Sequence, residues 1–278
     1  MIDLHMHTTV SDGLRTPAEV VRLCREAGLQ VLSVTDHDTV AAVEDVGRYA
    51  AAEGLTAVPG IEITAIHEGR DVHMLGYFID PTSASLRAFL ERQRAHRFDR
   101  ARTIAERLAG LGMPIDIEAV MQPAVDHPGR SVGRPWIARA LVEAGHVRNA
   151  KEAFDRWLGS GRPAFVPREG PLPAEAVGVI TQAGGIASLA HPGPLARDEI
   201  IAPLAEAGLA ALEAYHSEHD PDTTMYYLDM AARLGLAVSG GSDFHGGGAH
   251  GVERPGAVTL PRERFDELAM RAGRSYPS

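Results

Sequence analysis

Short apolar segments alternate with helical segments along most of this sequence, and this alternation constrains the fold more than any other feature. Strands are predicted at residues 2–7, 31–34, 56–64, 72–78, 186–190, 210–215, 237–239 and 257–260. Helices are predicted between them at residues 16–27, 40–53, 173–183, 197–207, 220–234 and 261–272. Thr16, Pro17 and Glu19 form a typical helix start, and Gly28 ends that helix. This order predicts a parallel α/β architecture.

A different pattern occupies the middle of the chain. Residues 83–111 predict one long helix that carries several arginines, and shorter helical segments with glycines and prolines follow to about residue 171. We therefore expect an α/β domain formed by residues 1–84 and 171–278, with a helical insertion subdomain at residues 85–170. An arginine run of this kind is most often a solvated helix face.

Composition limits the class of protein. The chain has 278 residues and is 45% hydrophobic, which supports a sizeable core. We find no apolar run long enough to cross a membrane and no secretory leader, and we expect a cytoplasmic protein without an obligate protein partner. The single cysteine, Cys24, has the spacing of a packed core thiol and excludes a disulfide within the chain. Because the net charge is −10, an anionic substrate would have to be attracted by metal ions or by placed arginines.

Acid and imidazole side chains recur at the C-terminal parts of the predicted strands. His5 and His7 lie two residues apart on one strand and therefore face the same side. The complete set of such residues is His5, His7, Asp12, His37, Glu62, His73, His191, Asp243 and His245. The C-terminal ends of parallel strands form one face, so these side chains are predicted to meet and to require cations for neutralisation. Incidental histidines beside strands are the alternative.

The ligand types narrow the choice of metal. Without thiolates, a mixture of imidazoles and carboxylates suits Mn²⁺, Fe²⁺ or Zn²⁺. We expect two or three divalent ions and favour Mn²⁺.

The motifs around these residues resemble the PHP family, the polymerase and histidinol phosphatase group. The matching segments are residues 5–7 (His-Met-His), 11–13 (Ser-Asp-Gly), 35–38 (Thr-Asp-His-Asp), 59–62 (Pro-Gly-Ile-Glu), 72–76 (Val-His-Met-Leu-Gly), 190–192 (Ala-His-Pro) and 242–245 (Ser-Asp-Phe-His). They occur in the family's order across nearly the whole chain. The resemblance implies a distorted (β/α)7 barrel with a trinuclear metal site.

The resemblance also implies how the ligands are grouped. One metal would be held by His5, His7, Glu62 and Asp243, and Glu62 would bridge to a second metal. The second metal would also use His73 and His191, and the third would use Asp12, His37 and His245.

Within the family, the chain is similar to stand-alone phosphoesterases that act on nucleoside 3′,5′-bisphosphates and on short 5′-phosphorylated RNA. The similarity includes residues 133–142 and 161–167 of the insertion, although Trp136 stands where the family commonly has His. The resemblance implies hydrolysis of the 3′-phosphate, with a nucleotide or an RNA 5′ end as the binding partner.

Several residues are assigned provisional roles in that reaction. Asp243 and His216 are the candidate catalytic residues, with His216 as the proton donor or as a solvated neighbour, and His219 as a weaker candidate. Arg134 and Arg162, with His216, are candidates for binding the substrate's second phosphate, since guanidinium groups recognise phosphate through two hydrogen bonds. Ordinary surface ion pairs are the alternative for both arginines.

Other residues are predicted to support the site. Asp36 and Asp38 could orient neighbouring ligands, and Asp38 could instead cap the following helix. The glycine run at residues 246–248 predicts a mobile loop, and whether residues 246–251 close over substrate is left open.

Two further functions remain possible from the sequence. One is a phosphatase for another small metabolite that uses the same metals. The other is a non-catalytic module that binds metal and nucleotide without turnover.

Overall fold

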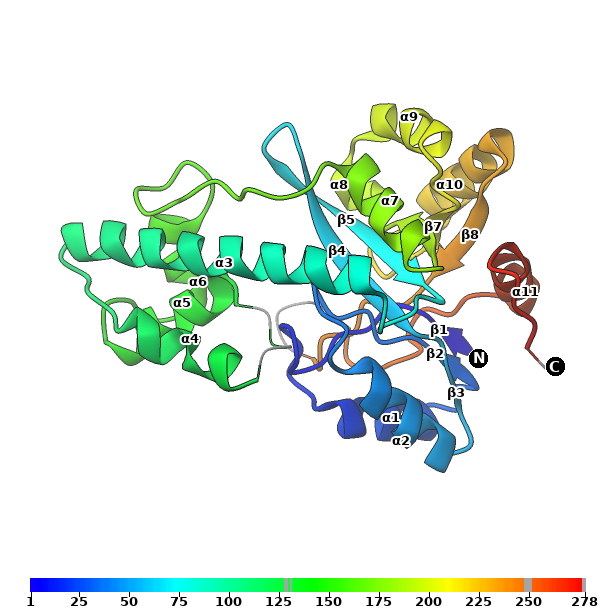
Figure 1. Ribbon diagram of the computed structural model, residues 1–278, viewed down its shortest axis with the longest axis horizontal. Helices are drawn as coiled ribbons and strands as arrows, with labels where there is room; N and C mark the ends of the chain where they lie inside the picture. The colour runs from blue at the N-terminus through cyan, green and yellow to red at the C-terminus, as the bar shows by residue number, and fades with distance from the viewer. Residues whose placement is uncertain (128–129, 131, 248–251, 277–278) are drawn as a thin grey trace. The chain divides into compact units, whose positions relative to one another are not determined.

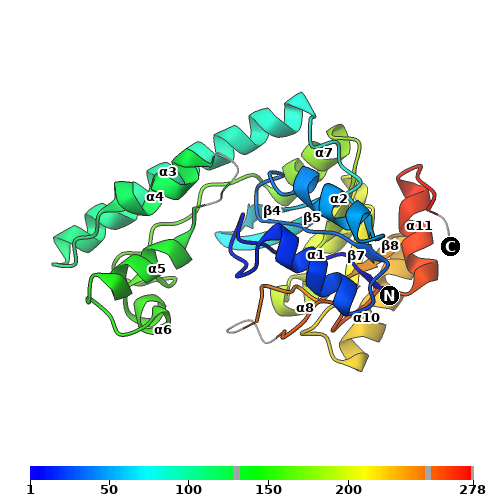
Figure 2. The same cartoon turned by 90° about the horizontal axis from the view of Figure 1, so that it is seen from below.

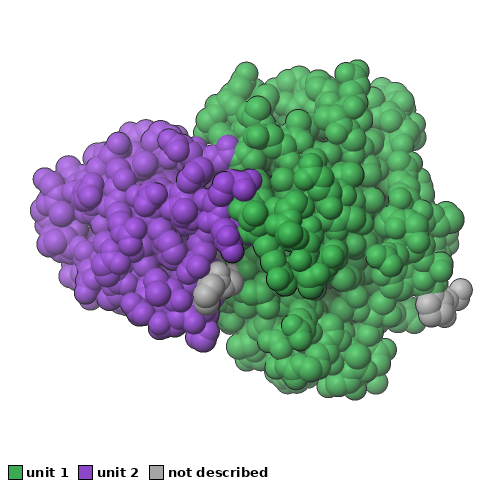
Figure 3. Space-filling model, in the orientation of Figure 1, with its two compact units in different colours: residues 1–89, 171–278 green, residues 90–170 purple. Residues whose placement is uncertain are grey.

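The computed structural model describes residues 1–127, 130, 132–247 and 252–276. These residues form two compact units, residues 1–89 with 171–278 and residues 90–170, coloured separately in Figure 3. The described helices include one long helix, but none of them combines enough length with the apolar character needed to cross a membrane.

The first unit contains two sheets (Figure 1). A parallel sheet has the order β1-β2-β3 and comprises β1 (Ile2–Asp3), β2 (Val31–Leu32) and β3 (Thr56–Ala57). The second sheet has the order β4-β5-β6-β7-β8, with β4 (Gly60–His67), β5 (Arg70–Tyr77), β6 (Ile186–Leu189), β7 (Ala211–Tyr215) and β8 (Ala237–Gly240).

The strand directions in the second sheet differ from the prediction. β4 pairs with β5 in antiparallel fashion, as does β5 with β6, and only β6, β7 and β8 are parallel. The physical reason is the connection after His67, because Glu68 and Gly69 both have positive φ and form a tight turn before Arg70. A parallel connection needs a crossover of about a dozen residues. The predicted parallel α/β architecture is therefore confirmed for β1–β3 and β6–β8 but not for the pairs β4–β5 and β5–β6.

Two isolated bridges connect the two sheets, one beyond the edge strands β1 and β8 and the other between the segment after the central strand β2 and the edge strand β4. Met6 pairs with Phe244 beyond β1 and β8, and His37 pairs with Glu62 beyond β2. Both bridges are parallel, and both contain or adjoin residues of the candidate site.

Helices cover the sheets on their outer sides. α7 packs on β4, β5 and β6, α10 on β7 and β8, α11 on β8 and α2 on β3, and α1 lies beside α2 (Figures 1 and 2). Their bounds are α1 Pro17–Glu26, α2 Val43–Ala52, α7 Pro173–Gln182, α8 Pro192–Leu195, η2 Asp198–Ile200, α9 Ile201–Glu206, α10 Pro221–Leu234 and α11 Arg262–Arg271. The predicted capping box of α1 is confirmed, because the Thr16 side chain accepts from the Glu19 N–H and the Glu19 carboxylate accepts from the Thr16 N–H.

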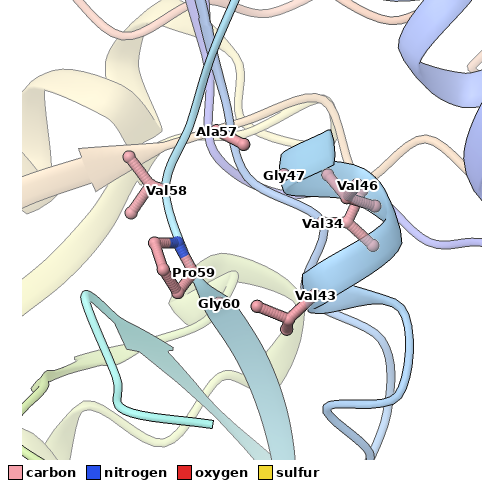
Figure 4. A pocket seen from close by; sticks show the side chains of 8 residues that line it. All are labelled: Val34, Val43, Val46, Gly47, Ala57, Val58, Pro59 and Gly60. Atoms are coloured by element: carbon pink, nitrogen blue, oxygen red, sulfur yellow. The ribbon is translucent and has the colours of Figure 1, made fainter. Parts of the chain in front are cut away.

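The core beneath α1 and α2 includes the single cysteine. The Sγ atom of Cys24 is buried and lies 3.6 Å from Sδ of Met6. A small apolar pocket lies between α2 and residues 57–60, with Val34, Val43 and Val46 on its wall (Figure 4). The pocket presents no ionisable side chain, so the chemistry of the unit has to be sought elsewhere.

One predicted strand is absent. Residues 257–260 do not form a strand, although the Leu260 N–H donates to the Ile2 carbonyl. Gly256 has a positive φ, and its N–H donates to the buried Asp3 carboxylate 2.8 Å away. This bond holds the segment in a turn rather than in an extended strand.

The second unit is helical. It begins within the long helix α3 (Ala84–Gly110), which confirms the helix predicted there, and continues through α4 (Ile117–Asp126), α5 (Arg134–Glu143), α6 (Ala150–Ala153) and the π-helix η1 (Phe154–Leu158). Its own apolar core includes Ile104, Leu108, Ile137, Leu141 and Leu158.

Candidate metal centre

Four ligand-type atoms from three parts of the chain converge in the first unit. The Nε2 atoms of His5 and His7 lie 3.2 Å apart. The Glu62 Oε2 atom is 3.4 and 3.2 Å from these two nitrogens, and the Asp243 Oδ1 atom is 3.2 and 3.1 Å from them. Ligands bound tetrahedrally at about 2.0–2.1 Å are separated by about 3.3 Å. The spacing among His5, His7 and Asp243 therefore matches that of three ligands of one metal ion, and Glu62 lies against both imidazoles of this group.

The other Glu62 oxygen faces a second pair of imidazoles. Oε1 lies 2.9 Å from Nδ1 of His73 and 3.4 Å from Nε2 of His191. His73 stands in the middle of β5 and Glu62 near the start of β4, so the prediction that every candidate lies at a C-terminal strand end was wrong for these two. The antiparallel hairpin brings them together from opposite strand directions.

A third group surrounds Asp12, which follows the loop after β1. Its carboxylate oxygens lie 3.8 Å from Nδ1 of His7, 3.6 Å from Nε2 of His37 and 3.5 Å from Nε2 of His245. His37 also approaches Glu62, with Nδ1 3.2 Å from Oε2. The structure thus gathers all nine predicted ligand residues into one continuous cluster.

Several atoms of this cluster are buried without a hydrogen-bond partner, which tests whether the site fits metal ions. Among the described residues they include Nδ1 of His7, Nδ1 of His37, Oε1 of Glu62 and Oδ1 of Asp243. Buried polar atoms are normally satisfied, and leaving several unsatisfied in one place is costly. Divalent cations would satisfy them, so this donor set fits a metal centre.

Charges within the cluster shift the pKa values of its side chains in the direction opposite to the shift caused by burial. Burial alone would raise the pKa of Asp243, but His5 and His7 hold it well below its ordinary value. Burial alone would lower the pKa of His7, but hydrogen bonds and charges of Asp243 and Glu62 raise it to about 10. For His37 burial dominates and lowers the pKa to about 3, despite the charges of Glu62 and Asp12. Without cations the cluster would therefore retain protons that metal ions can displace.

Two of the candidate ligands have a strained backbone. His191 has a φ of 27° and Asp243 a φ of 55°, in the left-handed region that non-glycine residues seldom adopt. A hydrogen bond from the main-chain N–H holds each residue in this conformation. The Asp243 N–H donates to the His5 carbonyl, and the His191 N–H donates to the Glu213 carboxylate. Gly241 allows the chain to approach, since a Cβ there would lie 2.3 Å from the His5 nitrogen.

Glu213 is a site residue that the sequence analysis missed. It is fully buried in β7, and its two oxygens accept from Nδ1 of His5 at 2.9 Å and from the His191 N–H at 2.8 Å. The bond to Nδ1 leaves Nε2 of His5 directed at the four-atom cluster. A carboxylate inside the otherwise apolar strand at residues 211–215 was the signal that could have identified it.

Two buried aspartates support the loops that carry ligands. Asp3 accepts from the Ser242 hydroxyl at 2.6 Å and from the Ser242 N–H at 2.9 Å, directly before Asp243. Asp36 accepts from the Thr8 and Ser11 hydroxyls, both at 2.7 Å, and so holds the loop that leads to Asp12. Asp3 was not predicted, whereas Asp36 was predicted to orient its neighbours.

Asp38 does not cap a helix. α2 begins at Val43 after Ala42, and the Asp38 carboxylate instead accepts from the Thr64 N–H at 2.9 Å. The alternative of a helix cap was therefore wrong, and Asp38 ties the segment that follows β2 to β4.

His216 lies beside the cluster and His219 slightly further away. The His216 side chain is buried, its Nδ1 accepts from the Glu218 N–H at 3.2 Å, and its Nε2 lies 3.5 Å from Oδ2 of Asp243. His219 accepts from the Gly193 N–H through Nε2 at 3.1 Å and donates from Nδ1 to the Ala214 carbonyl at 2.9 Å.

The two predicted phosphate-binding arginines belong to the second unit. Arg134 donates to the Leu158 carbonyl at 3.2 Å, and its guanidinium lies against the rings of Phe154 and Phe165. Arg162 is exposed in the turn after η1. Part of the predicted glycine loop, residues 248–251, lies outside the described residues.

Comparison with known proteins shows the family to which this chain belongs. A model of the PHP domain matches residues 3–115. The 5′-3′ exoribonuclease Rnm of Escherichia coli is 35% identical over 252 residues, covering 87% of this chain and 84% of that protein. The chain belongs to the PHP domain family.

Other PHP-type relatives match along almost the full length. A 3′,5′-nucleoside bisphosphate phosphatase of Chromobacterium violaceum is 33% identical, with 97% of each chain covered. A solved structure from Bifidobacterium adolescentis superimposes with a TM-score of 0.85 at 31% identity, covering 97% of this chain and 96% of that one. The similarity to these two proteins thus includes residues 90–170, which lie mostly beyond the matched domain model.

Proposed function

We propose that this protein is a metal-dependent hydrolase of phosphate esters that removes the 3′-phosphate of nucleoside 3′,5′-bisphosphates and also acts on 5′-phosphorylated RNA. The observation that carries the proposal is the convergence of His5, His7 and Asp243 at metal-ligand spacing, with a Glu62 oxygen 3.4 and 3.2 Å from the two imidazoles. The similarity to an exoribonuclease and to a nucleoside bisphosphate phosphatase supports the choice of substrate.

The residues proposed to hold the ions are grouped around Glu62. The first ion is assigned to the four-atom cluster, the second to Glu62, His73 and His191, and the third to Asp12, His37 and His245. When bound, divalent ions, with Mn²⁺ favoured, supply Lewis acidity that generates a nucleophile from water near neutral pH and offsets phosphoryl charge.

His216 is proposed to donate a proton to the leaving oxygen. Its Nδ1 accepts from the Glu218 N–H, so a neutral His216 carries its proton on Nε2. That nitrogen is buried, has no hydrogen-bond partner among the described residues and points toward Asp243. A donor fixed in this tautomer is suited to general acid catalysis.

Arg134 and Arg162 are proposed to bind the second phosphate of the substrate. Arg134 is held by the Leu158 carbonyl through one of its terminal nitrogens, which leaves other guanidinium N–H groups for phosphate. Positive charge in residues 90–170 explains how an acidic protein selects a doubly phosphorylated substrate.

The architecture that supports this chemistry is proposed to be a distorted (β/α)7 barrel, with residues 85–170 as an insertion. The bridges Met6–Phe244 and His37–Glu62 join the two sheets, the first of them beyond the edge strands β1 and β8, which supports closure. Both joints lie next to ligand residues, so closure and formation of the metal centre are coupled in this proposal.

The test is phosphate release from 3′-phosphoadenosine 5′-phosphate with Mn²⁺, combined with elemental analysis of the purified protein. We expect bound metal and release of the 3′-phosphate that depends on the 5′-phosphate. Asp243→Asn and His5→Ala should abolish turnover and reduce bound metal. Release from other phosphorylated metabolites instead would indicate a different phosphatase, and binding without turnover would indicate a non-catalytic module.

A further inference from the structure

The charges of this chain are strongly segregated between its two units. Residues 90–170 contain 14 arginines and lysines against 10 aspartates and glutamates, whereas the rest of the chain contains 13 against 27. A phosphate polymer is repelled by the larger unit except at its metal ions. The smaller unit is therefore the part of the protein to which a polyanion is attracted.

Most of the cations whose contacts are given for this unit already have a structural partner. Arg94, Arg107 and Arg134 donate to the main-chain carbonyls of Ala124, Phe165 and Leu158. The side chains of Arg102, Arg148, Lys151 and Arg156 pair with Glu118, Glu152, Asp155 and Glu152. These groups contribute to the field of the unit, but their donors are partly occupied.

The surroundings of Trp136 differ from those of the paired cations, because two arginines lie beside its aromatic ring. The guanidinium carbons of Arg130 and Arg139 lie 6.0 and 5.9 Å from the centre of its indole ring. Trp136 is half-buried against the core of the unit, and Arg139 is exposed one turn further along α5. Neither arginine pairs with a carboxylate among the residues that the structure describes. A held aromatic ring beside unneutralised cations has the composition of a platform for single-stranded nucleic acid.

We propose that Trp136 stacks on a base of a single-stranded RNA substrate and that Arg139 binds an adjacent phosphate. This inference rests on the proposed function and deepens it, because it names residues that select a polymer over a nucleoside bisphosphate. Stacking accepts any base, so the subsite has no sequence preference.

The test uses tryptophan fluorescence. The chain has two tryptophans, so Trp157→Phe leaves Trp136 as the only tryptophan, whose emission is excited selectively at wavelengths that tyrosine does not absorb. A 5′-phosphorylated adenylate oligomer, added in chelator to prevent cleavage, is expected to quench this emission. In the matched variant Trp136→Phe, the remaining Trp157 should report no change. Unchanged Trp136 emission at saturating oligomer, with binding measured independently by anisotropy, would overturn the proposal.

Salt dependence tests the role of Arg139. We expect Arg139→Ala to weaken oligomer binding about tenfold and to reduce the slope of log affinity against log salt by about 0.7, the contribution of one phosphate contact on a single strand. Arg148→Ala, which removes an exposed cation of the same unit already paired with Glu152, is the control for the general field. Equal slopes and affinities for the two variants would refute a local contact.

Kinetics separate this inference from the proposed function. Trp136→Ala is expected to raise KM for the oligomer at least about fivefold more than KM for 3′-phosphoadenosine 5′-phosphate, the effect of losing one stacked base. In Trp136→Phe, which keeps an aromatic ring, KM for the oligomer should return most of the way to the value of the unmodified protein. An equal rise for both substrates would overturn the subsite. If neither substrate is hydrolysed, the proposed function fails, while the fluorescence measurement still decides the binding proposal.

Discussion

The Glu213 carboxylate accepts from Nδ1 of His5 at 2.9 Å, and both side chains are completely buried. The same carboxylate fixes the His191 amide, so one residue of β7 orients two candidate ligands from the segments that follow β1 and β6. Carboxylates that hold a ligand imidazole are typical supports of metal sites.

We therefore expect Glu213→Gln to reduce bound metal and to lower kcat about 10- to 100-fold, because the amide keeps the volume but loses the charge that holds His5. Elemental analysis and phosphate release measure the two effects. Glu206→Gln, on the exposed side of α9, is the matched control. Full metal content and activity in Glu213→Gln would contradict the role.

His219 is predicted to position His191 through the backbone. Its Nε2 accepts from the Gly193 N–H, so His219→Phe removes the acceptor and loosens the strained turn at His191, whereas His219→Gln retains an acceptor. We expect loss of metal and a decrease in kcat of about tenfold in the Phe variant, comparable to the loss of an outer-shell partner. Recovery in the Gln variant distinguishes positioning from simple packing; equal defects in both variants would argue against it.

Metal uptake is predictably pH-dependent. Because the pKa of His7 is raised to about 10 by Asp243 and Glu62, protein stripped of metal keeps this proton near neutral pH, and a metal ion has to displace it. Affinity for Mn²⁺ should therefore increase with pH. Calorimetry in two buffers of different ionisation enthalpy measures the released proton, and identical heats in both would refute the prediction.

The same group links pH to the stability of the stripped protein. The folded-state pKa of His7 lies above its ordinary value of 6.5, so its stabilising effect is complete below that value and is lost as the pH rises toward 10. We expect His7→Gln to flatten the alkaline decline in the melting temperature of the metal-free protein. An unchanged profile would show that His7 does not carry the extra proton.

His216 should matter most for poor leaving groups. If Nε2 donates a proton to the leaving oxygen, His216→Gln will lower kcat about 100-fold or more for a nucleoside 3′-phosphate but much less for 4-nitrophenyl phosphate, whose leaving group needs no proton. Because both substrates are measured on the same preparation, a loss of folded protein or of metal would lower kcat for both and is thereby controlled. An equal loss on both would assign His216 to metal or substrate positioning instead.

Arg134 should affect only doubly phosphorylated substrates. Arg134→Ala is expected to raise KM about tenfold or more for a bisphosphate, which corresponds to one charged hydrogen-bond contact, and to leave KM for an aryl phosphate nearly unchanged. Thermal melting monitors the loss of its bond to the Leu158 carbonyl. Equal increases in KM for both substrates would rule out the phosphate contact.

Local signals in the sequence predicted many helices correctly because they depend on neighbouring residues. The Thr16 capping box and the long helix of residues 84–110 are examples. Strand direction was missed, although residues 67–71 are a polar stretch too short for the crossover that a parallel connection needs. The segment at residues 257–260 has strand-like composition, but its conformation depends on a hydrogen bond to Asp3, which is distant in sequence.

For the candidate site as well, some residues could be predicted from the sequence and others only from the structure. Residues with ligand chemistry beside predicted strands could be selected from the sequence, and the structure brings them together. Glu213 and Asp3 act through contacts with His5 and Ser242, and such pairings across the fold are not encoded in spacing along the chain. The roles of Arg134 and Arg162 depend on substrate and await the experiments above.

The burial of Cys24 against Met6 has a practical consequence. Burial raises the pKa of this thiol, and the chain has no other cysteine, so thiol-directed reagents should leave the native protein unlabelled. A cysteine introduced at an exposed position in each unit, such as Ala144 and Ala202, would then be the sole attachment point for a spectroscopic probe. A doubly labelled protein would then report the distance between residues 90–170 and the rest of the chain in solution, with and without substrate.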